Sequence, residues 1–162
     1  MVGLPGSGKS SWLGQIGVSA ISSDSIRDLL IDDPTCQTIH GRVFSTVRFL
    51  LRNRLELRRP VTYIDATSLT RKERRAYVKT ADLYDADIEA VFFDTPVEVC
   101  VERNARRHRV VPTAAILELA HKLRPPSFEE GFCRITVIQA AQARRSSSQP
   151  GAPAAAGLPL GR

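Results

Sequence analysis

The sequence predicts an α/β fold in which helices cover both faces of a parallel sheet. Short runs rich in β-branched and aromatic residues alternate with longer segments of helical periodicity, a pattern typical of parallel strands joined by helical crossovers. A glycine-rich turn opens the chain just before a helical segment, as expected at the edge of such a sheet. The length of 162 residues suits one domain with one hydrophobic core.

Local patterns place the individual elements. We expect strands over residues 18–23, 61–65, 88–93 and 134–139, each a short apolar run bounded by polar or turn residues. We expect helices over residues 24–31, 39–58, 70–84, 96–106 and 113–123. In the longest of these, Val43, Val47 and Leu51 share one side while arginines fill the rest, and Pro60 ends it.

The two ends of the chain differ from this pattern. Only Met1 and Val2 precede the glycine-rich turn, so either the first strand is very short or the sequence begins inside a longer natural one. Residues 139–162 are rich in Ala, Pro, Gly and Ser and have no apolar period, which predicts a disordered tail. We therefore expect one folded domain over residues 1–138.

Composition bounds the class of protein. Hydrophobic residues make up 43% and charged residues 25% of the chain, which is typical of soluble globular proteins. The sequence contains no apolar run of membrane-spanning length, so we expect a cytoplasmic protein without a membrane partner. Its three cysteines are odd in number and widely spaced, which predicts neither a disulfide framework nor a zinc site. The net charge of +6 permits attraction to nucleic acid, although a solvated helix face is the favoured explanation for any single arginine-rich stretch.

Residues 3–10, GLPGSGKS, satisfy the phosphate-binding pattern GxxxxGK[ST] in full. Its glycines let backbone N–H groups turn inward around phosphate oxygens, and the next helix points its positive end at them. Lys9 would bridge the β- and γ-phosphates of ATP, and the Ser10 hydroxyl would ligate Mg²⁺. The alternative is a turn that merely joins a strand to a helix. The predicted cofactor-binding set is Gly3, Leu4, Pro5, Gly6, Ser7, Gly8, Lys9, Ser10 and Ser11.

Asp24 and Arg27 are candidates for the acceptor side of a transfer reaction. Asp24 stands where the strand over residues 18–23 is followed by a helix, a position that opens onto the ligand cleft of parallel sheets. Its carboxylate can accept a hydroxyl proton, and Arg27, one turn later, can hold a phosphoryl group. The alternative is that Asp24 is a helix N-cap and Arg27 a surface residue.

Two further features complete the candidate site. Asp65 ends the strand over 61–65, where such enzymes place an acidic residue near the metal or the acceptor; we assign it to the acceptor side, with a simple turn residue as the alternative. The segment 103–109 is rich in arginine and could close as a small lid over the nucleotide, with Arg103 and Arg107 as its candidate catalytic residues. The alternative is a basic helix C-terminus.

Five segments carry a resemblance to a known family: GLPGSGKS, ISSDSIR, YIDATSLTRKERR, FFDTPVEVCVERNARR with VVP after it, and PPSFEEGF with RITV. Over residues 1–138 the chain resembles the P-loop polynucleotide 5′-hydroxyl kinases, including the kinase modules of bacterial end-healing kinase-phosphatases, within a wider group of zeta-toxin-like and kinase-like ATP-binding proteins. The resemblance implies a P-loop NTPase three-layer sandwich with a parallel sheet and a lid.

The resemblance also implies an activity and residue roles. The chain would transfer the γ-phosphoryl group of ATP to a polynucleotide 5′-hydroxyl, with single-stranded or broken-end nucleic acid as partner. Lys9 and Ser10 would hold ATP and Mg²⁺, Asp24 would be the general base, and Arg27 would act at the reacting phosphate. Arg107 would be the lid arginine, with Arg103 as a second candidate. The same motifs occur in standalone kinases of small alcohols, and a non-catalytic ATP-binding module is the remaining alternative.

Overall fold

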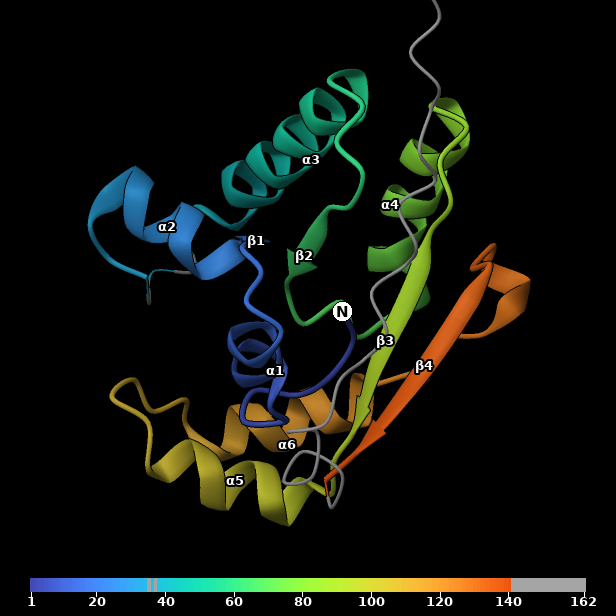
Figure 1. The fold of residues 1–162 in the computed structure, drawn as a ribbon. Coiled ribbons are helices and arrows are strands. Elements are labelled where there is room, and N and C mark those ends of the chain that lie inside the picture. The colour runs from blue at the N-terminus through green and yellow to red at the C-terminus, as the bar shows by residue number, and fades with distance from the viewer. Residues whose placement is uncertain (35, 37, 141–162) are drawn as a thin grey trace, which may run out of the picture.

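The computed structural model describes residues 1–34, 36 and 38–140, so most of the predicted tail lies outside the described residues. Among these residues, the four strands form two parallel pairs, each a two-stranded sheet (Figure 1). β1 (Ala20–Ser22) pairs with β2 (Tyr63–Asp65), and β3 (Glu89–Asp94) pairs with β4 (Arg134–Gln139). In the part of the chain that is described, no helix combines the length and apolar character needed to cross a membrane.

The first residues of the chain join these two pairs. The Met1 nitrogen donates to the carbonyl of Ile64 in β2 at 3.0 Å. Val2 donates to the carbonyl of Val91 at 2.8 Å and accepts from the N–H of Phe93 at 2.9 Å, both in β3. The order across the sheet is therefore β1, β2, residues 1–3, β3 and β4. Before the glycine-rich turn, the chain forms a single parallel β-bridge, between Val2 and Phe92 of β3.

The helices follow the predicted periodicities closely. Where bounds were predicted, they lie within two residues of those in the structure. No bounds were predicted for the helix after the glycine-rich turn, and the short 3₁₀ turn η1 was not predicted. The helical elements are α1 (Lys9–Gln15), α2 (Ser23–Ile31), α3 (His40–Glu56), α4 (Arg71–Leu83), α5 (Val97–Ala105), α6 (Thr113–Lys122) and η1 (Phe128–Glu130).

Helices cover both faces of the sheet, which confirms the predicted fold class. Successive residues of a strand point to opposite faces. Tyr63 and Phe93 meet the edge of Trp12 in α1, with ring centroids 6.1 and 6.0 Å apart. Ile64, the next residue of β2, instead packs on the cluster that includes Val47 of α3. Helix α1 therefore lies on one face and α3 on the other, giving three layers.

A second core lies beneath the glycine-rich turn. Leu4 and Leu69 pack there with Cys100 of α5 and Ile116 of α6, and each of the four is 2% exposed or less. Figure 1 shows α5 and α6 side by side below α1, so this cluster ties the turn to both helices. The packing fixes where the turn lies relative to the segment that follows α5.

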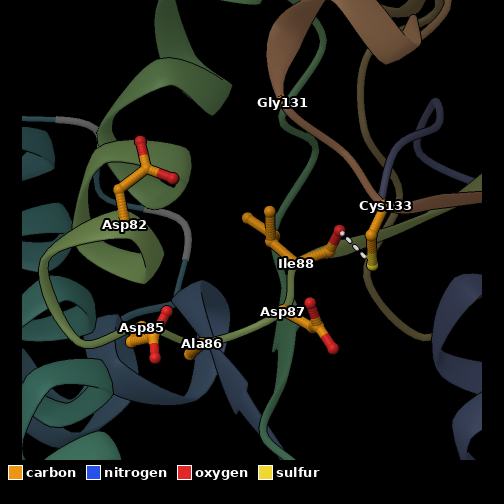
Figure 2. A pocket seen from close by; sticks show the side chains of 7 residues that line it. All are labelled: Asp82, Asp85, Ala86, Asp87, Ile88, Gly131 and Cys133. Carbon is orange, nitrogen blue, oxygen red and sulfur yellow. Dashed lines mark hydrogen bonds between the residues drawn. The ribbon is translucent and has the colours of Figure 1, made fainter.

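A pocket of about 330 Å³ lies at the amino-terminal edge of the sheet, where β3 and β4 begin (Figure 2). The Cys133 thiol points to the Ile88 carbonyl at 3.3 Å. The glycine-rich turn lies at the opposite, carboxyl edge. Because the lining includes three carboxylates and no cation, it does not suit phosphates. The lining residues are Asp82, Asp85, Ala86, Asp87, Ile88, Gly131 and Cys133.

Arg74 of α4 is a structural residue rather than part of a solvated basic face. It is 2% exposed, and its guanidinium makes a bidentate pair with Glu130 at 2.7 and 2.8 Å. It also donates to the carbonyls of Ser68, Leu69 and Arg124. One side chain therefore connects α4, the loop after β2 and the segment that leads to η1.

We expect Arg74→Met to destabilise the fold by about 3–5 kcal/mol, because it removes the bidentate partner of the buried Glu130 carboxylate. Arg71→Met is the matched control: that side chain is 59% exposed and lies 3.8 Å from the same Glu130 carboxylate. Its loss should cost less than about 1 kcal/mol. Denaturant unfolding of both variants checks this, and equal effects would contradict the structural role of Arg74.

The same pair predicts a pH dependence. Burial favours a raised pKa for Glu130, but hydrogen bonds from Arg74 and the Ser127 N–H, with the charges of Arg74 and Arg71, outweigh burial and lower it. A lowered folded pKa contributes stability above the ordinary value of 4.5 that is lost as the pH falls through the folded value. The stability difference between wild type and Arg74→Met should therefore shrink in acid.

Candidate active site

At Gly6 the glycine-rich turn passes too close to α5 to carry a side chain. Gly6 has φ of 82°, and a Cβ there would collide with the carbonyl of Cys100. Gly8, with φ of 105°, precedes α1 in the left-handed region. The hydroxyl of Thr95 donates to the Ser7 carbonyl at 3.1 Å and braces the turn from the end of β3. The N–H groups of the first turn of α1 lack intrahelical partners and can face phosphate oxygens.

Lys9 is buried under this turn. Its ammonium donates to the carbonyls of Gly3 and Leu4, each at 2.8 Å. Burial lowers the pKa of Lys9 to about 8 against the opposing charges of Asp65 and Asp24. Phosphates at the turn would favour the charged ammonium, so the residue is suited to bind anions.

Ser10 and Asp65 come together although they are far apart in the sequence. The Ser10 hydroxyl donates to Oδ2 of Asp65 at 2.9 Å, and Asp65 is the last residue of β2. Oxygen donors of this kind suit Mg²⁺, which usually takes one or two protein ligands and completes its shell with phosphates and water. The contact supports the metal-side alternative for Asp65. Its assigned acceptor-side role stays a prediction.

Asp24 and Arg27 form an ion pair on α2. The Arg27 guanidinium donates to Oδ1 of Asp24 at 2.9 Å, as their helical spacing predicts. The alternative roles are wrong: Ser22 is the N-cap, accepting from the Ser25 N–H at 3.3 Å, and the Arg27 side chain is only 5% exposed. The Nε of Arg27 is buried with no hydrogen-bond partner among the described residues. A buried guanidinium with an unused donor is suited to receive an anionic group.

The segment after α5 brings a further arginine to this pair. Nη1 of Arg109 lies 3.1 Å from Oδ2 of Asp24. The side-chain amide of Asn104, itself 1% exposed, donates to the Val111 carbonyl at 2.8 Å and accepts from the Val111 N–H at 3.0 Å. Asn104 thus closes the loop that carries Arg109. Arg106 in the same loop is exposed and pairs with Glu102 at 2.7 Å.

The two predicted lid arginines lie on the nucleotide side. Nη1 of Arg103 is 3.8 Å from the position that a Cβ on Gly8 would take. The charge of Arg107 is near enough to Lys9 to contribute to lowering the pKa of Lys9. Both arginines therefore lie near the turn, at the end of α5 and just beyond it.

Sequence reasoning did not single out Thr95, Asn104 or Arg109. The Thr-Pro step that follows β3 stands at the start of the helix expected over 96–106, but nothing in it indicated a bond to the turn. Arg109 was visible only as one member of an arginine-rich segment. Its partner Asp24 is distant in sequence, and spacing rules describe contacts within one element only.

Comparison with known families decides the class. The family model for an AAA domain, AAA_33, matches residues 1–126, from the glycine-rich turn through α6. The chain belongs to this AAA domain family. Membership makes it a P-loop, nucleotide-binding, kinase-like domain. No curated protein matches the chain.

Nucleotide binding by this AAA domain should take up a proton at alkaline pH. With the pKa of Lys9 near 8, roughly three-quarters of its amine is neutral at pH 8.5. Bound phosphates favour the ammonium, so affinity should fall toward about tenfold per pH unit above pH 8. Calorimetry at pH 8.5 in two buffers of different ionisation enthalpy measures the uptake.

Lys9→Met is the control for that measurement, since it should abolish both proton uptake and tight binding. The folded pKa of Lys9 lies below its unfolded value of 10.5, so burying it costs stability at pH 7, and the cost disappears between pH 8 and 10.5. The variant should therefore still fold. A binding enthalpy that is the same in both buffers would contradict the lowered pKa.

The Ser10 and Asp65 contact predicts the magnesium dependence of this AAA domain. Asp65→Asn and Ser10→Ala should each raise the Mg²⁺ concentration needed for half-maximal ATP binding about tenfold or more. Asp28→Asn, an exposed carboxylate on α2, is the matched control and should leave it unchanged. If Asp65→Asn instead weakened only acceptor binding, the acceptor-side role would be the correct one.

Proposed function

We propose that this protein is an ATP- and Mg²⁺-dependent kinase that transfers the γ-phosphoryl group to a hydroxyl, with a polynucleotide 5′-hydroxyl as the favoured acceptor. The observation that carries the proposal is the carboxylate of Asp24, held at 2.9 Å by the buried Arg27 at the same sheet edge as the phosphate-binding turn. A domain that only binds nucleotide has no evident use for this pair.

The residues divide the work of transfer. Lys9 and the N–H groups of the turn would hold the phosphates of ATP. Asp24 would accept the hydroxyl proton as the acceptor oxygen attacks the γ-phosphorus and the bond to the β-phosphate oxygen breaks, releasing ADP. Arg27, Arg107 and Arg103 would stabilise charge on the transferring group. The Ser10 hydroxyl would hold Mg²⁺, whose charge would offset that of the phosphates.

Exposed arginines support a polyanionic acceptor. Arg42, Arg52, Arg58 and Arg59 are exposed along and just after α3, the long helix next to α2. Arg54, by contrast, is committed to Thr62 and Val61, at 2.9 and 3.0 Å. The free part of the basic stretch can contact backbone phosphates. Its charge alone does not distinguish a polynucleotide from a small anionic alcohol.

The test is transfer of labelled γ-phosphate from ATP with Mg²⁺ to 5′-hydroxyl oligonucleotides, beside a panel of small alcohols. We expect label on the oligonucleotide, with activity falling at least about 10²-fold in Asp24→Asn because the general base is removed. Asp28→Asn, one turn further along α2, is the matched control and should retain activity.

The alternatives give different results. Label on a small alcohol alone would assign the chain to the small-molecule kinases with the same catalytic set. ATP binding without transfer to any acceptor would support a non-catalytic module, and wild-type rates in Asp24→Asn would exclude Asp24 as the base. Oligonucleotide affinity should also weaken steeply with salt, because phosphate contacts release counterions.

A further inference from the structure

Asp24 is the point where two parts of the site meet. Its Oδ1 accepts a hydrogen bond from Arg27 at 2.9 Å, and its Oδ2 lies 3.1 Å from Nη1 of Arg109. Arg27 belongs to α2, as Asp24 does, whereas Arg109 comes from the loop 106–112 between α5 and α6. Each carboxylate oxygen is thus engaged by a guanidinium, and the two guanidinium groups come from different parts of the fold.

The two ion pairs differ in how easily they can open. The side chain of Arg27 is 5% exposed and that of Arg109 is 28% exposed. Ion pairs with access to water contribute little stability and exchange readily, whereas a buried partner is held by its surroundings. Arg109 is therefore the arginine that can leave Asp24 while Arg27 stays in place.

The loop that carries Arg109 also reaches the nucleotide side. Arg107, two residues earlier, lies near Lys9, whose pKa its charge helps to lower. The loop is closed at its base by the two hydrogen bonds between Asn104 and Val111, at 2.8 and 3.0 Å. A short loop with joined ends moves as a unit, so a displacement at one arginine is transmitted to the other.

We propose that Arg109 is a gate on Asp24, a positioning residue that controls access to the carboxylate. The proposal rests on the kinase function proposed above. While Arg109 holds Oδ2, an acceptor hydroxyl or a water molecule must compete with the guanidinium for that oxygen. The incoming acceptor displaces Arg109 from Oδ2 as it binds, and the loop moves with the arginine. Asp24 therefore becomes fully available as a base only once the acceptor is present, which limits transfer of the phosphoryl group to water.

Arg109→Gln tests the gate, because it removes the charge and keeps a polar side chain. Hydrolysis of ATP without acceptor should rise about three- to tenfold, and the KM for acceptor should fall about two- to fivefold with kcat changed less than about twofold. Arg109→Lys should restore both toward wild type. Arg106→Gln, in the same loop but paired with the exposed Glu102 instead of Asp24, should change neither.

Two kinetic results would overturn the gate. A raised acceptor KM or a large loss of kcat in Arg109→Gln would place Arg109 on the substrate instead. Unchanged hydrolysis together with an unchanged acceptor KM would show that the ion pair does not control access to Asp24.

A second measurement separates the gate from the kinase function. Hydrogen exchange of the amides in loop 106–112 should speed up at least about threefold in both Asp24→Asn and Arg109→Gln, and not in Arg106→Gln. Unchanged exchange in Asp24→Asn overturns the gate, whatever the kinase assay gives. Faster exchange in a protein that transfers phosphate to no acceptor supports the contact and defeats the proposed function alone.

Discussion

The hydrogen bonds that Val2 makes with β3 are the constraint on which the site depends. They hold Met1 and Val2 between the two strand pairs, and the glycine-rich turn starts at Gly3, directly after them. Because all the strands are parallel, their carboxyl ends meet at one edge of the sheet. Asp65 ends β2 and Thr95 follows β3. The register of Val2 against β3 therefore places the turn beside both residues. The hydrogen bond from the Thr95 hydroxyl to the Ser7 carbonyl then holds the turn at the end of this strand.

Arginine has three separate uses in this chain, and net charge distinguishes none of them. Arg74 is a structural connector, buried among carbonyls and paired with Glu130. Arg27 is buried at the site beside Asp24, with a donor left over. Arg52 and its exposed neighbours remain available to a polyanion. The planar guanidinium carries five donors in a fixed fork and stays charged, so it can satisfy more acceptors at once than the three donors of a lysine ammonium. The positive balance of the sequence therefore overstates the surface that nucleic acid could contact.

What could be predicted from the sequence is what one element or one motif contains. Element bounds followed from apolar periodicity, and the Asp24 to Arg27 contact followed from helical spacing. The N-cap alternative for Asp24 was wrong: Ser22 and Asp24 are both good caps, and a strand that ends one residue earlier than expected decides between them. The contacts of Arg109 and Arg74 could not be predicted, because they depend on how packed helices bring distant loops together. Those contacts distinguish this site from a bare phosphate-binding turn.

A phosphate-binding turn solves only half of the problem that a kinase faces. Once ATP is held with its phosphates neutralised, water competes with the intended acceptor for the same transfer. Excluding that reaction requires the base to be unavailable until both substrates are present. The loop between α5 and α6 is placed to impose such a condition, since its arginines lie near Lys9 at one end and contact Asp24 at the other. Asn104 holds the two ends of the loop together. How far each arginine can reach therefore depends on the length of its own side chain. The buried amide is therefore as much a part of the site as the arginines it supports.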